Sequence, residues 1–193
     1  MKRHNNLTLY KAALETNDHI FNVYTQQYAE RTQEAHQKYL GPFLKRFLAL
    51  LPGRNILDLG CGPGRDLSYF TAQGYKPIGI DYSREMVNLC QQKKLTAYQA
   101  DFLSLPFGDR RFDGVWAYAS LTLIPPAAME EVLKVIYSLL IPGGVLALGM
   151  RKGKQKGWKM DERYETKKYV ARYESSEIMT LLEKSKLKLV ELK

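Results

Sequence analysis

An acidic residue and three glycines stand close together between an apolar run and a run suited to a helix. The stretch reads Ile56-Leu57-Asp58-Leu59-Gly60-Cys61-Gly62-Pro63-Gly64-Arg65. Glycine carries no side chain, so a ligand can approach the backbone closely and a positive φ costs little. Free amide groups at a helix start favour negative charge such as a ligand carboxylate. Asp58, at the end of the preceding strand, would face the cationic part of the same ligand. The pattern predicts a strand, a ligand-binding turn and a helix.

A second acid closes the next apolar run, Pro77-Ile78-Gly79-Ile80-Asp81. Asp81 lies 81 − 60 = 21 residues beyond Gly60, about the 20-residue distance at which a Rossmann-like unit presents an acid to ribose hydroxyls. A carboxylate can accept hydrogen bonds from both vicinal hydroxyls. Asp81 could also cap the helix that starts near Ser83, and the two roles are compatible. Tyr82 and Met86 would flank an adenosine, although Met86 suits a core position equally well.

The glycine turn lacks one feature of a dinucleotide-binding fingerprint, because Arg65 occupies the place of the third glycine. With Asp58 ahead of it, the turn instead resembles the first motif of the class I S-adenosylmethionine-dependent methyltransferases. The resemblance implies S-adenosyl-L-methionine as cofactor and S-adenosyl-L-homocysteine as product. It assigns cofactor binding to Asp58, Gly60, Gly62, Gly64 and Asp81. An ordinary strand-to-helix turn is the structural alternative.

Later motifs resemble the same family. Asp101 and Phe102 follow an expected third strand at residues 95–100, where the family places an acid that holds the adenine and an apolar residue that packs near the ring. Asp101 could also be a plain turn residue. The fourth strand, residues 112–119, should bring Ala117 beside the transferable methyl group. Relatives often carry a histidine near the end of the following loop, and this chain has Leu123 there. The resemblance runs from residue 57 to residue 150.

The resemblance implies an α/β fold of the Rossmann-like, doubly wound type, with a mostly parallel sheet and helices on both faces. Residues 1–50 are expected to form an N-terminal helical lid of two helices, broken at Gly41-Pro42. Residues 51–193 are expected to form the methyltransferase domain, and the whole is one structural unit. The segment with Phe21, Tyr24 and Tyr28 resembles the helix that covers the cofactor in small-molecule methyltransferases. Tyr24 is therefore predicted to bind the cofactor, and Tyr28 is a further lid candidate.

The methyl acceptor is expected to be a small molecule. Residues 151–159 are basic, glycine-punctuated and aromatic-tipped, which fits either a solvated loop or a loop that receives an anionic substrate. Three residues, Tyr164, Tyr169 and Tyr173, are expected to line its pocket. The catalytic residue is unknown. Tyr118 and Tyr24 are candidates, but a phenol with a pKa of about 10 is a poor base.

Composition narrows the remaining possibilities. The length of 193 residues and the apolar fraction of 45% suit one domain with its own core. Two cysteines give no disulfide framework, and neither a membrane span nor a signal peptide is read, so the cytoplasm is the expected location. The net charge of +9 invites nucleic acid as a partner, but that reading needs charge gathered on one face and is less favoured. No metal site is expected.

Two rival functions and the end of the chain stay open. A nicotinamide-dependent oxidoreductase would explain Asp81, and a non-catalytic S-adenosylmethionine-binding subunit would explain the absent histidine. A helix from Ser175 and a short strand, Leu187 to Leu192, are expected to finish the chain. The family usually adds one more antiparallel strand, so a truncated form is expected first, and a homodimer that covers the sheet edge second. The oligomeric state is therefore monomer or homodimer.

Overall fold

The computed structural model describes residues 2–192, without the side chains of residues 2–5 and 33–39. Its elements follow in this order: α1 (Lys2–Val23), α2 (Thr25–Tyr39), α3 (Gly41–Leu50), β1 (Asn55–Leu59), α4 (Arg65–Ala72), β2 (Lys76–Asp81), α5 (Arg84–Gln92), β3 (Ala97–Gln99), β4 (Phe112–Tyr118), the 3-10 turn η1 (Leu121–Leu123), α6 (Pro126–Leu139), β5 (Leu140–Gly149), β6 (Lys156–Asp161), β7 (Thr166–Ala171) and α7 (Ser175–Lys184). None of the described helices is long and apolar enough to cross a membrane.

Five parallel strands form the main sheet, in the order β3-β2-β1-β4-β5. The central strand is β1, where Leu57 pairs with Ile78 of β2 on one side and with Val115 of β4 on the other. The direction of winding reverses between β1 and β4. In open α/β sheets ligands bind at that switch point, beyond the carboxyl ends of the strands. The predicted Rossmann-like sheet is confirmed.

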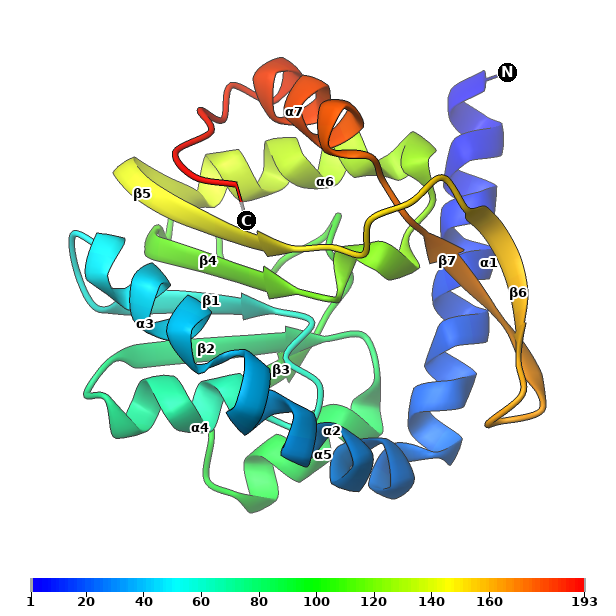
Figure 1. Cartoon of the computed structure of the whole chain (residues 1–193), viewed down its shortest axis with the longest axis horizontal. Coiled ribbons are helices and arrows are strands. Elements are labelled where there is room, and N and C mark those ends of the chain that lie inside the picture. Colours follow the sequence, from blue (N-terminus) through cyan, green and yellow to red (C-terminus); the bar gives the residue numbers. More distant parts are fainter. Residues whose placement is uncertain (1, 193) are drawn as a thin grey trace.

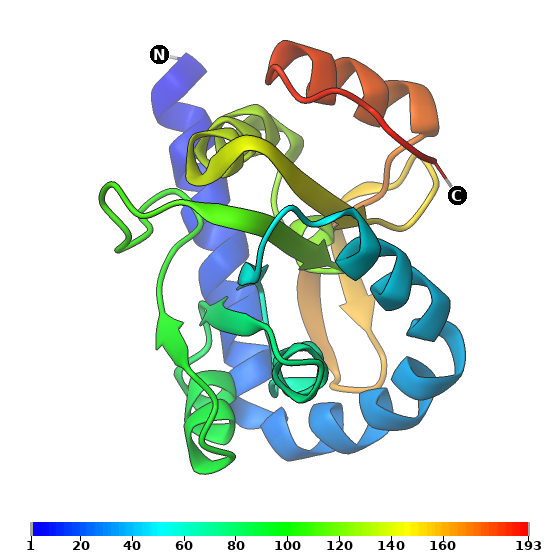
Figure 2. The same ribbon diagram turned by 90° about the vertical axis from the view of Figure 1, so that its left-hand side faces the viewer.

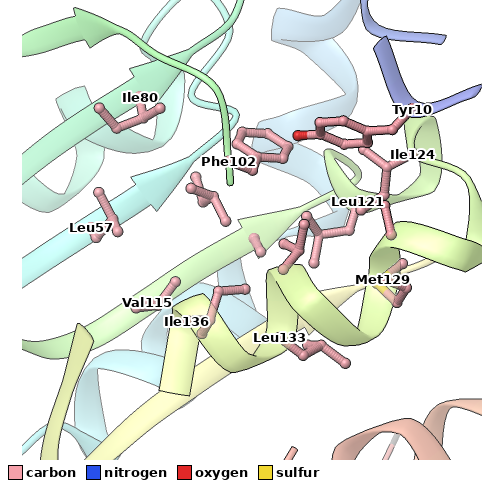
Figure 3. Close-up of a cluster of buried hydrophobic side chains, with 14 of the residues drawn as sticks. Tyr10, Leu57, Ile80, Phe102, Val115, Leu121, Ile124, Met129, Leu133 and Ile136 are labelled. Carbon is pink, nitrogen blue, oxygen red and sulfur yellow. The ribbon is translucent and has the colours of Figure 1, made fainter. Parts of the chain in front are cut away.

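Helices cover both faces of this sheet because successive residues of a strand point to opposite sides. Ile56 packs in a cluster with Phe47 of α3 and Phe70 of α4 on one face. Its neighbour Leu57 belongs to the larger cluster on the other face, which includes Met129 of α6. Figure 3 shows this larger cluster, with side chains from the strands and from α6 meeting beneath α1. Because both faces are covered, the apolar residues Ile56, Leu57 and Leu59 of β1 are all fully buried.

The first helix stands across the carboxyl ends of the strands. In Figure 1 the strand arrows point toward α1, and Figure 2 shows the same arrangement from the side. Tyr10 and Ala13 are fully buried in the main core. The chain then turns after Val23 and again near Leu40, which gives three helices before β1. The expectation of two helices is wrong, because the break near Tyr24 carries no proline or glycine that would have marked it.

An antiparallel hairpin, β6–β7, lies beside α1 and outside the main sheet (Figure 1). Asn17 fixes this arrangement: its amide donates to the carbonyls of Leu123 (3.1 Å) and Tyr169 (3.3 Å), and its oxygen accepts from the Tyr169 N–H (3.0 Å). Residues 156–159, expected to belong to a loop, are the start of β6. Trp158 pairs with Tyr169 across the hairpin, so the segment is a strand with an aromatic cross-strand pair.

The expected last strand is also wrong. Residues 187–192 have no strand structure. Lys186 turns the chain after α7 with a φ of 61°, Leu187 packs against the main core, and Glu191 pairs with Arg46 of α3 at 2.8 Å. These contacts hold the segment in place without a ladder of backbone hydrogen bonds. The apolar residues that suggested a strand, such as Val190 at 73% exposure, are left facing solvent.

Candidate active site

Two backbone turns interlock at the carboxyl ends of β1 and β2. The amides of Gly60 and Cys61 donate to the Ile80 carbonyl at 2.7 and 2.9 Å. The carboxylate of Asp81 accepts from the Gly62 N–H (2.8 Å) and from the Ser83 N–H (2.9 Å). Burial raises the pKa of Asp81 to about 6, although these amide bonds act in the opposite direction. Asp81 is therefore a partly desolvated acceptor fixed beside the glycine turn.

The three glycines of the turn have different reasons to be glycine. A side chain at Gly60 would collide with Ser120, whose Cβ lies 2.2 Å from the place of the added atom. At Gly64, which has a φ of 80°, it would meet Leu95 at 2.7 Å. At Gly62 the nearest atom is on the Tyr28 ring, 4.0 Å away. Gly60 and Gly64 are thus required by packing, whereas Gly62 borders open space.

Asp58 lies under the turn as a buried carboxylate, 2% exposed. Its Oδ2 atom has no hydrogen-bond partner among the described residues. Burial raises the pKa of Asp58 well above its usual range, and the negative charge of Asp66 adds to the effect. An unpaired buried carboxylate is costly unless a cation or a donor reaches it. The arrangement favours a positively charged or N–H-bearing group next to Asp58.

The first helix supplies polar contacts that sequence reasoning missed. Asn22 accepts from the Ser83 hydroxyl at 2.7 Å and from the Glu85 N–H at 3.2 Å, so α1 helps to cap α5. Ser83 itself is the N-cap residue, accepting from the Met86 N–H. This assigns the cap to Ser83 rather than to Asp81. Asp18, one turn before Asn22, has its pKa raised by burial and faces the same space as Asp81. No periodicity in the sequence distinguishes these residues from other polar positions of a helix.

The predicted adenine pair is split by the structure. Phe102 is buried and faces the space below α1, whereas one oxygen of Asp101 accepts from the Tyr10 hydroxyl (2.5 Å) and the Leu103 N–H (2.8 Å). Burial raises the pKa of Tyr10, with the Asp101 contact as the next cause. Tyr10 therefore donates as a phenol. Tyr10 and Asp101 are 91 residues apart, so no local pattern indicates this contact.

A cavity of about 320 Å³ opens between the glycine turn and α1. The predicted site residues that line it are Gly60, Gly62, Asp81, Tyr82, Met86, Phe102 and Tyr118. Five others lie outside its lining: Asp58, Gly64, Asp101, Ala117 and Tyr24. Ala117 is fully buried within β4, and Gly64 is the N-cap of α4. Residues that line the cavity without having been predicted include Asn17, Asp18, Arg65 and Ser120.

A second cavity, of about 450 Å³, adjoins the first on the side of the β6–β7 hairpin. The two linings share Phe21, Tyr28, Thr32, Ala119, Leu123 and Arg151. Tyr164 lines the second cavity as predicted. Tyr169 and Tyr173 do not: both are 4% exposed and pack in the main core. The expectation for these two is wrong because Tyr169 of β7 and Tyr173, just after β7, both pack into the main core.

Three tyrosines lie near the junction of the cavities. Tyr118 lines the first cavity and stacks on Trp116 with ring centroids 5.9 Å apart. Tyr24 donates to the Tyr164 carbonyl (3.3 Å) and packs on its ring, outside both linings. Tyr28 lines both cavities, and burial raises its pKa. A phenol with a raised pKa stays protonated at neutral pH, so Tyr28 can donate a hydrogen bond but is no general base.

Comparisons with known proteins agree with this geometry. Residues 56–144 match a family described as "Methyltransferase domain". An uncharacterized methyltransferase of Synechocystis is 32% identical over 52% of this chain and 49% of its own length. A malonyl-[acyl-carrier protein] O-methyltransferase of Enterobacter lignolyticus is 30% identical over 52% of this chain and 41% of its own. The chain thus spans half or less of the length of these relatives.

A solved structure extends the likeness to nearly the whole chain. The 1,6-didemethyltoxoflavin-N1-methyltransferase of Burkholderia thailandensis, solved with its substrate and S-adenosylhomocysteine, has a TM-score of 0.72. It is 23% identical, with 95% of this chain and 80% of that chain covered, and supports the fold. Residues 56–144, just under half of the chain, thus resemble the methyltransferase-domain family, and the likeness to the solved structure supports the fold alone.

Proposed function

We propose that this protein transfers a methyl group from S-adenosylmethionine to a small molecule that carries an anionic group. The observation that carries the proposal is the first cavity, where Gly62 leaves the backbone open to a ligand and Asp81 presents a desolvated carboxylate beside it. Both lie at the carboxyl ends of the neighbouring strands β1 and β2, beside the switch point between β1 and β4, and open α/β sheets bind ligands at this end. The family match and the S-adenosylhomocysteine complex of a protein of the same fold support this choice of cofactor.

The residues present fit this cofactor in type. Asp81 would accept the ribose hydroxyls, and Phe102 and Met86 would flank the adenosine. Asp58, whose buried oxygen has no described partner, suits the neighbourhood of an ammonium group. The roles of five residues stay predictions, since none of them lines the cavity: Asp58, Gly64, Asp101, Ala117 and Tyr24.

The bound cofactor would supply an electrophilic methyl carbon, to which the acceptor donates an electron pair while the carbon–sulfur pair stays on sulfur. The chain's own part is to align the acceptor and to keep water out. These two effects can supply most of the rate enhancement of such a displacement. Leu123 lines both cavities and leaves that position without a base. We therefore expect an acceptor atom that needs little proton removal, such as a carboxylate, a thiolate or a neutral amine.

Release of S-adenosylhomocysteine tests the proposal. Purified protein is incubated with S-adenosylmethionine and a panel of carboxylates, thiols, amines and phenols, and the product is measured by mass spectrometry. The proposal expects turnover with at least one small acceptor and the matching mass gain of one methyl group. Binding of the cofactor without turnover over the panel would instead favour a non-catalytic subunit.

A further inference from the structure

The second cavity has an unbalanced charge. Its lining contains six basic and two acidic residues, a formal difference of 6 − 2 = +4: Arg31, Arg151, Lys159, Arg163, Lys168 and Arg172 against Asp161 and Glu162. These residues come from α2, from the hairpin β6–β7 and from the segment after β5. They are far apart in the sequence, and the fold brings them together around one cavity.

Part of this charge is neutralised inside the protein. Asp161 is 5% exposed and forms ion pairs with Arg163 (2.6 Å) and Lys168. The hydrogen bond from Arg163 is the main reason why the pKa of Asp161 lies below its usual range. The Arg163 and Lys168 charges are therefore already engaged. Arg151, Lys159 and Arg172 have no ion-pair partner among the described residues.

Arg151 occupies the junction of the two cavities. It follows the last residues of β5 and is the one charged side chain that the described linings share. The other shared residues, such as Phe21, Ala119 and Leu123, are apolar or neutral. Arg151 can therefore offer a positive charge to a molecule that extends from the junction into the second cavity. Arg172, half-buried on the segment after β7, lines the second cavity alone.

We propose that the second cavity is the acceptor site and that Arg151 and Arg172 hold the acceptor by a carboxylate or phosphate group. The inference rests on the proposed function for the identity of the first cavity. Guanidinium groups pair with carboxylates and phosphates through two parallel hydrogen bonds, and this geometry fixes orientation as well as charge. The anionic group would anchor the acceptor on the hairpin side, with its reactive atom at the junction beside Tyr28.

Binding of simple probes tests the acceptor site. Benzoate, phenyl phosphate and inorganic phosphate are titrated by calorimetry into the protein saturated with S-adenosylhomocysteine, and benzamide serves as the uncharged match of benzoate. The same series is repeated with Arg151→Gln and Arg172→Gln. Arg54→Gln is the control, because Arg54 is exposed just before β1, at the amino end of that central strand, and lines neither cavity. Each variant is also titrated with S-adenosylhomocysteine alone.

We expect at least one organic anion to bind tenfold or more tightly than benzamide, and its affinity to fall at least tenfold in both cavity variants but less than twofold in Arg54→Gln. Arg172→Gln should leave S-adenosylhomocysteine affinity unchanged, which separates this inference from the proposed function. Equal binding of benzoate and benzamide, equal loss in Arg54→Gln, or no anion bound below 10 mM in the wild type would overturn the assignment. So would tight binding of a single-stranded oligonucleotide that depends on the same two arginines.

Discussion

Gly62 and Asp81 are joined by a hydrogen bond from backbone amide to carboxylate, and we propose a separate role in ligand binding for each. Gly62 provides room, because no described atom lies closer than 4.0 Å to the place of an added side chain. Asp81 provides the acceptor, with a pKa raised by burial. Each property can be altered separately by a single substitution.

Gly62→Ala should impair ligand binding more than folding. The φ of 51° costs alanine about 1 kcal/mol, and the methyl group would enter the space assigned to the cofactor. We expect S-adenosylhomocysteine affinity to fall more than tenfold in calorimetry while thermal unfolding changes little. Gly64→Ala is the matched comparison, because its methyl group meets Leu95 and Cys90 and should destabilise the fold. Normal affinity in Gly62→Ala would mean that the turn is structural only.

Asp81 should make cofactor binding depend on pH. Its pKa of about 6 means that the empty protein protonates this carboxylate as the pH falls through 6, and the protonated group is a weaker acceptor. Affinity for S-adenosylhomocysteine should therefore be about tenfold weaker at pH 5 than at pH 7. Folding stability responds in the opposite sense: a raised pKa contributes stability below about pH 4, and that contribution is lost as the pH rises toward 6.

Asp81→Asn is the control for this pH dependence. The variant should bind more weakly at pH 7, by about 1.5 to 3 kcal/mol, because hydrogen bonds to a charged acceptor are lost. Its affinity should no longer change between pH 5 and pH 7. If the slope persists in calorimetry, the titrating group is another one, with Asp18 on α1 the nearest alternative, and the ribose assignment to Asp81 is wrong.

At the scale of elements, the hydrogen bonds of Asn17 hold α1 in place in addition to its apolar packing. Asn17 is 4% exposed and makes three hydrogen bonds to η1 and β7. Asn17→Ala should lower the free energy of unfolding by about 2 to 4 kcal/mol, since three bonds are lost and the Tyr169 amide is left unpaired. Urea denaturation measures this loss. Asn88→Ala, on α5 with only long contacts to Glu85, should change it by less than about 0.5 kcal/mol.

The lid role suits α2 better than α1. The middle of α1 is part of the main core through Tyr10, Ala13 and Leu14, whereas α2 packs on its chain neighbours α1 and α3. Phe21 and Tyr28, in edge-to-face contact at 5.1 Å, stand at the junction of both cavities just where α2 begins.

Hydrogen exchange can locate the lid. We expect amides of α2 to exchange fast in the free protein and to slow when S-adenosylhomocysteine binds, because weakly packed elements open first. Amides in the middle of α1 should be protected in both states. Equal exchange of α2 with and without ligand would remove its lid role, and fast exchange throughout α1 would restore the first 23 residues as the moving part.

At the scale of the whole molecule, the sequence predicted the features that depend on residues close together in the chain. The parallel sheet with helices on both faces and the positions of Gly62 and Asp81 at strand ends follow from apolar runs that end in glycine or acid at regular distances. The hairpin β6–β7 did not emerge, because its charged and aromatic residues suit an exposed loop equally well. The strand predicted for residues 187–192 is wrong for the opposite reason. The apolar alternation of a strand is present there, but no partner strand pairs with it.

Long-range contacts account for the part of the site that was missed. Tyr10 reaches Asp101 across 91 residues, and Asn17 reaches Tyr169 across 152. A single sequence contains no sign of such pairs. The cationic second cavity has the same origin, because its basic residues come from separate segments: one from α2, one from the segment after β5, three from the hairpin and one from the segment after β7. The basic segment 151–159 indicated only Arg151 and Lys159 of its lining, and the other basic residues of the cavity lie outside that segment.

The most direct test of the account is a calorimetric titration of the 193-residue chain with S-adenosylhomocysteine and, separately, with NADH. The account predicts one S-adenosylhomocysteine site with a Kd in the micromolar range, roughly −7 to −9 kcal/mol, lost in Gly62→Ala, and no measurable heat with NADH. Saturable binding of NADH that depends on Asp81, with no response to S-adenosylhomocysteine, would contradict it and would favour a nicotinamide-dependent oxidoreductase.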